Sequence, residues 1–204
     1  MLYYILNISR VLSIFFISII FTFQFHVYSH NTPIAEQNEV KRYSQTVISQ
    51  VFHNLEGSTN LSGSEVGALV VRNLDLTGMR NFVLGRHMRS VSQSEINRFD
   101  QAFKQYMTNI FAKTFSRYQC KGVQIKSVMS HRPGEYLVKS SVMLSGAPSM
   151  NVDCIVRKMN NGQYKVFDIL TENYSMINNI RVLCTGVLES GGISQLTREI
   201  NTMM

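Results

Sequence analysis

Apolar residues recur every three or four positions in the first part of the chain, alternate with polar residues in the middle, and return to helical spacing in the tail. The first spacing is typical of amphipathic helices and the second of half-buried strands. The pattern predicts helices over residues 38–55, 64–74, 77–90 and about 92–118, strands over 123–130, 135–144, 150–159 and 163–170, and helices over 174–188 and 193–203. Helices before and after a run of sequential strands predict an α+β domain with helices packed on one face of an antiparallel sheet.

Local motifs indicate several of the boundaries. Residues 92–95 (Ser-Gln-Ser-Glu) form a capping box, in which a serine hydroxyl and a glutamate carboxylate satisfy each other's backbone N–H groups at a helix start. Residues 131–134 (His-Arg-Pro-Gly) and 160–162 (Asn-Asn-Gly) are typical of tight turns. Gly191 and Gly192 break the helical spacing of the tail. The four predicted strands are therefore joined by short turns as a meander.

The first 25 residues differ from the rest, because they are almost wholly apolar and Arg10 is their only charged side chain. Val11 to Phe25 has the length of a secretory signal core, and Val27 and Ser29 suit a cleavage site. We expect residues 1–29 to be a signal peptide removed after Ser29, and residues 30–204 to form one domain. An uncleaved anchor in the inner membrane is the alternative.

The chain is basic, with 20 Lys and Arg against 13 Asp and Glu and a net charge of +7. Loss of residues 1–29 removes one positive charge, so the mature charge is +6. A basic surface favours anionic partners such as lipid headgroups, acidic proteins or nucleic acid. Export argues against nucleic acid.

The potential reactive groups are few and scattered. Cys120, Cys154 and Cys184 show no CxxC motif and no Cys/His spacing typical of a metal site, and the sequence does not select a disulfide pair. No cofactor is predicted. Asp168, near the end of the last strand, is the candidate general base of an enzyme if burial beside Tyr164 or Tyr174 raises its pKa. The alternative for Asp168 is to bond backbone groups where the strand becomes a helix.

Three segments carry a family resemblance: Asn81 to His87 (NFVLGRH), Tyr164 to Met176 (YKVFDILTENYSM) and Gly191 to Leu196 (GGISQL). Together they resemble, in order and spacing, the MlaC-type periplasmic phospholipid-binding proteins, which are also described as toluene-tolerance auxiliary components. The resemblance covers residues 74–203.

The resemblance implies an NTF2-like or cystatin-like α+β fold. In it, a four-stranded twisted antiparallel sheet and the helices on one of its faces enclose an apolar cavity. It implies a monomeric lipid-binding domain over residues 30–204 that is not an enzyme. The expected function is a periplasmic phospholipid shuttle that maintains outer-membrane lipid asymmetry. Its partners would be an inner-membrane ABC transporter complex with an MCE-domain subunit and an outer-membrane lipoprotein–porin complex. The alternatives are an enzyme using Asp168 and a non-lipid periplasmic adaptor.

Apolar residues on the inner faces of these elements are the candidates for contact with the acyl chains of a glycerophospholipid. They are Phe82, Val83, Phe99, Phe103, Met107, Phe111, Val142, Val156, Phe167, Ile169, Met176, Ile177 and Ile180. Each is also typical of an ordinary core. Arg86, Arg89 and Arg132 are candidates for the headgroup, because a guanidinium pairs bidentately with phosphate, although they also suit a solvated surface.

Overall fold

The computed structural model describes residues 33–55, 62–117 and 120–202, so the predicted signal peptide lies outside the described residues. The elements follow the predicted order. They are helices α2 (Ile34–Leu55), α3 (Gly63–Arg72) and α4 (Leu76–Leu84), the 3₁₀ helix η1 (Gly85–Ser90), helix α5 (Gln93–Arg117), strands β1 (Cys120–Arg132), β2 (Glu135–Leu144), β3 (Met150–Lys158), β4 (Tyr164–Thr171) and β5 (Tyr174–Ser175), and helix α6 (Met176–Thr202). The α+β prediction is confirmed.

The sheet is antiparallel, and its strands are in the order β1-β2-β3-β4-β5. The prediction of four strands is one short, because Tyr174 and Ser175 pair with the end of β4 instead of starting the last helix. The link between β4 and β5 consists of Glu172 and Asn173, which both take a positive φ, of 48° and 69°. That conformation suits a two-residue hairpin. A glutamate seldom adopts it, so the sequence did not mark the turn.

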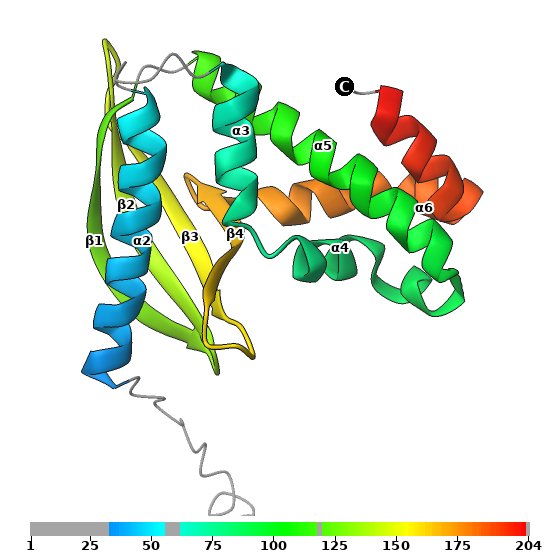
Figure 1. The fold of residues 1–204 in the computed structure, drawn as a ribbon, viewed down its shortest axis with the longest axis horizontal. Helices are drawn as coiled ribbons and strands as arrows, with labels where there is room; N and C mark the ends of the chain where they lie inside the picture. The colour runs from blue at the N-terminus through cyan, green and yellow to red at the C-terminus, as the bar shows by residue number, and fades with distance from the viewer. Residues whose placement is uncertain (1–32, 56–61, 118–119, 203–204) are drawn as a thin grey trace, which may run out of the picture. The chain divides into compact units, whose positions relative to one another are not determined.

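The helices cover one face of this sheet (Figure 1). Helix α2 packs across β1 and β2, whereas α4 and α6 contact β4. Helix α3 lies along α5, and α5 contacts α6. The largest fully buried side chains of the helical layer include Phe99, Phe103 and Met107 of α5 and Leu196 and Ile200 of α6. A solid apolar core therefore lies among the helices, in addition to the contacts between helices and sheet.

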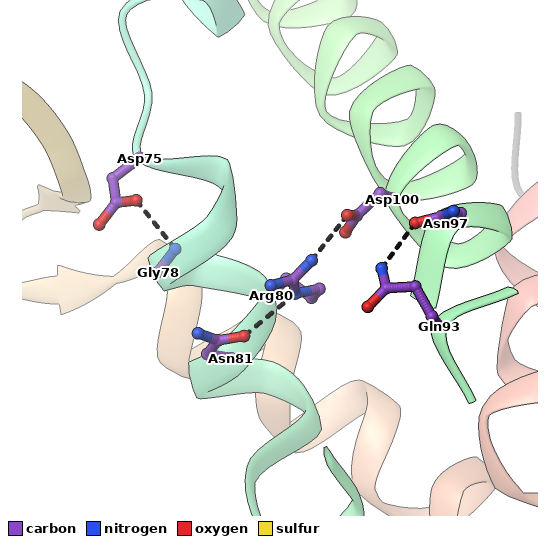
Figure 2. Close-up of polar contacts among 7 residues, drawn as sticks. All are labelled: Asp75, Gly78, Arg80, Asn81, Gln93, Asn97 and Asp100. Carbon is purple, nitrogen blue, oxygen red and sulfur yellow. Dashed lines mark hydrogen bonds and ion pairs between the residues drawn. The ribbon is translucent and has the colours of Figure 1, made fainter. Parts of the chain in front are cut away.

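Polar contacts fix α4 against the start of α5 (Figure 2). The carboxylate of Asp75 accepts the N–H of Gly78 at 2.8 Å and caps the helix. The guanidinium of Arg80 forms an ion pair with Asp100 of α5, with a distance of 2.6 Å from Nη1 to Oδ2. Gly85, with a φ of 49°, ends α4. The helix predicted over 77–90 is therefore α4 followed by η1.

Particular residues set the start of α5 and the kink within α6. The predicted capping box is confirmed, since the N–H of Ser92 donates to Glu95 Oε2 at 3.0 Å and the N–H of Glu95 donates to Ser92 Oγ at 3.3 Å. The break predicted at Gly191 and Gly192 is confirmed, because α6 consists of two helical stretches that meet in a kink at Gly192. Gly192 has a φ of 65° and a ψ of −169°, a conformation essentially restricted to glycine.

Candidate functional site

A cavity of about 520 Å³ lies between the inner face of the sheet and the helices. Residues of β1 to β5 build one wall, and α2, α3, α5 and the start of α6 build the other. Side chains alternate along a strand, so antiparallel partners such as Val123 and Val142 both project into the cavity. Within the described part of the chain, no residue that lines the cavity is charged.

The polar groups inside the cavity are bonded to the protein itself. The amide of Asn73 donates to the carbonyl oxygen of Leu69 at 3.0 Å, and Ser140 Oγ donates to the carbonyl oxygen of Val152. Buried polar groups normally have such partners, because leaving one unpaired costs free energy. Both side chains therefore donate to the protein backbone, and the interior presents a largely apolar surface to a ligand.

The thiol of Cys154 lines the same cavity. Burial, together with the nearby carboxylates of Asp153 and Asp168, raises its pKa to about 12. The group stays protonated at neutral pH and behaves as a small apolar side chain. Cys184 is also a free thiol, whereas the side chain of Cys120 lies outside the described residues. Across the residues that the structure describes, no group of three or more His, Cys, Asp or Glu side chains could hold a metal ion.

The structure divides the predicted lining residues into two sets. Five of them line the cavity: Phe111, Val142, Ile169, Met176 and Ile180. The other eight lie in the apolar core or pack against it without lining the cavity: Phe82, Val83, Phe99, Phe103, Met107, Val156, Phe167 and Ile177. Aromatic contacts account for part of this core, since Phe99 and Phe103 stack at 5.5 Å between ring centroids.

The lining also contains residues that were not among the candidates. They include Val47, Ile48 and Val51 of α2, Val70 of α3, Ile110 of α5, Val123 of β1, Leu144 of β2, Met150, Val152 and Cys154 of β3, Val166 of β4 and Leu183 of α6. The helical spacing of α2 and the alternation in the strands indicate that these positions face inward. That signal does not distinguish a hollow from a filled interior.

The three predicted headgroup arginines do not line the cavity. Arg86 donates from Nη2 to Glu189 Oε1 at 3.0 Å, and both side chains are exposed. Arg89 lies in η1, a segment without a lining residue. Arg132 ends β1, nine residues beyond Val123, which corresponds to about 30 Å along an extended strand.

The cavity meets solvent where its lining residues are exposed. We call this part the mouth and define it by Thr114 of α5, Thr171 of β4, Tyr174 of β5, and Asn179 and Leu183 of α6. Tyr174 is 74% exposed and Leu183 is 69% exposed, although both line the cavity. The site is thus an uncharged hollow with an apolar interior and mostly polar side chains at its mouth.

Asp168 is buried and does not line the cavity. Its Oδ1 accepts the backbone N–H of Ile169 at 2.8 Å and that of Ile177 at 3.0 Å. The second bond satisfies a free donor in the first turn of α6. Of the two tyrosines that the enzyme hypothesis places beside Asp168, Tyr164 donates its hydroxyl to Glu39 at 3.1 Å, and Tyr174 is 74% exposed. The interpretation of Asp168 as a group that bonds backbone at the strand-to-helix passage is confirmed.

Replacement of Asp168 by alanine is expected to destabilise the protein by about 1–3 kcal/mol, because the N–H groups that it accepts lose a partner. Asp168→Asn keeps an acceptor oxygen and should cost less, about 0.3–1 kcal/mol from the lost negative charge near the α6 N-terminus. Urea unfolding of both variants measures the difference. Equal stability of Asp168→Ala and the unchanged protein would contradict this role.

The fold and the cavity define a class of protein: an α+β domain that encloses an apolar cavity. The chain belongs to the MlaC family, because the family described as "MlaC protein" matches residues 41–202. Members of this family are periplasmic, non-enzymatic phospholipid-binding proteins of the Mla lipid transport system.

Among solved structures, a similar fold occurs in the phospholipid-binding protein from Ralstonia solanacearum, determined in complex with a phospholipid. The two chains share 18% sequence identity at a TM-score of 0.66, and the match covers 81% of this chain and 94% of that one. Comparison with the curated proteins gives no match. Among the helices that the structure describes, none has the length and apolar character needed to cross a membrane.

Proposed function

We propose that this protein binds a glycerophospholipid with its acyl chains in the cavity and its polar end at the mouth. The observation that carries the proposal is the hollow of about 520 Å³, whose described lining is uncharged and largely apolar. This volume lies within the range of roughly 300–1,000 Å³ typical of ligand sites. The phospholipid bound to the similarly folded Ralstonia protein supports the same assignment.

Transfer energetics explain why such a lipid needs a carrier. Exposing the acyl chains to water would cost on the order of 24 kcal/mol, because they contain about 30 methylenes at ~0.8 kcal/mol each. A lipid therefore does not cross an aqueous gap as a free monomer at a useful concentration. Enclosing the chains avoids most of this cost, while the headgroup stays in water.

The proposed route is between the two membranes of the envelope. Residues 1–29 act as a signal peptide, and the mature protein works as a monomer in the periplasm. It exchanges lipid with an inner-membrane ABC transporter complex that has an MCE-domain subunit and with an outer-membrane lipoprotein–porin complex. The net charge of +6 that remains after the loss of residues 1–29 favours acidic docking faces on both partners. This exchange supports outer-membrane lipid asymmetry.

The test is to express the full chain, purify the protein without detergent, extract it with organic solvent and identify the lipids by mass spectrometry. We expect glycerophospholipid in stoichiometric amount, and reloading of the stripped protein from phospholipid vesicles. A protein that carries no lipid and takes none from vesicles would overturn the proposal and favour a non-lipid adaptor.

A further inference from the structure

Three polar side chains at the mouth have no hydrogen-bond partner among the described residues: the Thr171 hydroxyl, the Tyr174 phenol and the Asn179 amide. The fourth polar group of the mouth, the Thr114 hydroxyl, already donates to the carbonyl oxygen of Ile110 at 2.8 Å. The three available groups therefore differ from Asn73 and Ser140 of the interior, whose side chains donate to backbone carbonyl oxygens.

The hairpin between β4 and β5 holds two of these groups in place. Thr171 pairs with Tyr174 across the turn formed by Glu172 and Asn173. The turn is anchored to β3, because Glu172 Oε1 accepts the N–H of Asn151 at 2.8 Å and the N–H of Glu172 donates to the carbonyl oxygen of Asn151 at 3.1 Å. The carboxylate is thereby bonded to β3, and the hairpin presents neutral side chains to the cavity.

The third group is positioned by the start of α6. Ser175 Oγ accepts the N–H of Asn178 at 3.1 Å, which caps the helix directly after β5. Asn179 follows in the first turn and lines the cavity, whereas its exposed neighbour Asn178 does not. The hairpin and the start of α6 thus bring three hydrogen-bond donors to the boundary between the apolar interior and water.

We propose that Thr171, Tyr174 and Asn179 form a neutral binding site for the oxygen atoms of the lipid's glycerol ester and phosphate region. The inference rests on the proposed function and adds the residues that hold the polar end of the cargo. Ester and phosphodiester oxygens accept hydrogen bonds, and each of the three side chains donates. Tyrosine suits this boundary because its ring is apolar and its hydroxyl is polar.

The experiment compares the release of three probes from the full chain to acceptor vesicles: a pyrene-labelled phospholipid, a pyrene-labelled diacylglycerol and a pyrene-labelled long-chain alkane. Thr171→Val and Tyr174→Phe each remove a donor with little change in shape, and Asn179→Ala removes the whole amide. Each should release phospholipid about three- to tenfold faster, the loss expected for one hydrogen bond. Release of the alkane should not change, because it has no oxygen to bind.

Asn178→Ala is the matched control, since it alters the same residue type on the same helix turn outside the cavity, and it should release phospholipid at the original rate. Faster release of both glycerolipids assigns the contact to the ester oxygens, and faster release of phospholipid alone assigns it to the phosphate. Unchanged phospholipid release in all three variants, or equally faster alkane release, overturns the site. Failure of the unchanged protein to load phospholipid would instead overturn the proposed function.

Discussion

Val152→Trp is expected to produce a protein that no longer carries phospholipid. Val152 lies on β3, the middle strand of the sheet, and its side chain lines the cavity. An indole in place of the isopropyl group occupies space that the acyl chains need within a hollow of about 520 Å³. The measurement is the amount of phospholipid extracted per mole of purified protein, which should fall to background.

The stability of Val152→Trp tests the cavity independently of lipid. Extra volume forced into a filled core typically costs about 1–3 kcal/mol, whereas volume added to a hollow costs less because it displaces no side chain. The chain has no tryptophan of its own, so the emission of the introduced indole reports whether it is buried.

Val182→Trp is the control for this substitution, because Val182 is 66% exposed on α6 and does not line the cavity. It should retain its phospholipid. A Val152→Trp protein that carries as much phospholipid as Val182→Trp would show that the acyl chains lie elsewhere.

Much of the fold follows from short-range signals in the sequence. The capping box of Ser92 and Glu95 starts α5, and the turn at Pro133 and Gly134 joins β1 to β2, as their local chemistry predicts. Strand β5 could not be predicted in this way. Its turn depends on Glu172, whose conformation is stabilised by bonds to Asn151, a residue distant in sequence. Features that depend on such distant partners are absent from local patterns.

The candidate site was harder to predict, for a reason that α5 illustrates. Phe99, Phe103, Met107 and Phe111 follow one helical stripe, and all four are buried. Only Phe111 of these lines the cavity, whereas the first three lie in the core. The periodicity of a helix specifies which face is apolar. Whether a space opens beside that face is determined by the arrangement of several elements.

The arginines predicted for the headgroup lie outside the cavity lining, and the side chains at the mouth are neutral. The chemistry of phosphate recognition favours guanidinium groups, and Arg86 lies in one of the family-like segments. In the folded chain, Arg86 instead pairs with Glu189 of α6. Thr171, Tyr174 and Asn179 gave no comparable signal, because threonine, tyrosine and asparagine are common on any protein surface.

Phe103→Ala and Phe111→Ala are expected to have different effects, although both remove a phenyl group from α5. Phe103 is 1% exposed and lies in the filled core, so its truncation leaves a new void and should cost about 3–5 kcal/mol of stability. Phe111 is 7% exposed and borders a space that already exists. Its truncation enlarges that space and should cost about 1–3 kcal/mol, close to the transfer term alone.

Lipid release separates the two variants further. Phe111→Ala removes a wall of the cavity and should release pyrene-labelled phospholipid faster, whereas Phe103→Ala should release it at the original rate at temperatures where it remains folded. Urea unfolding of the lipid-free proteins and transfer to acceptor vesicles are the two measurements. Equal losses of stability together with equal release rates would mean that Phe103 and Phe111 share one environment, and the boundary between core and cavity would then lie elsewhere.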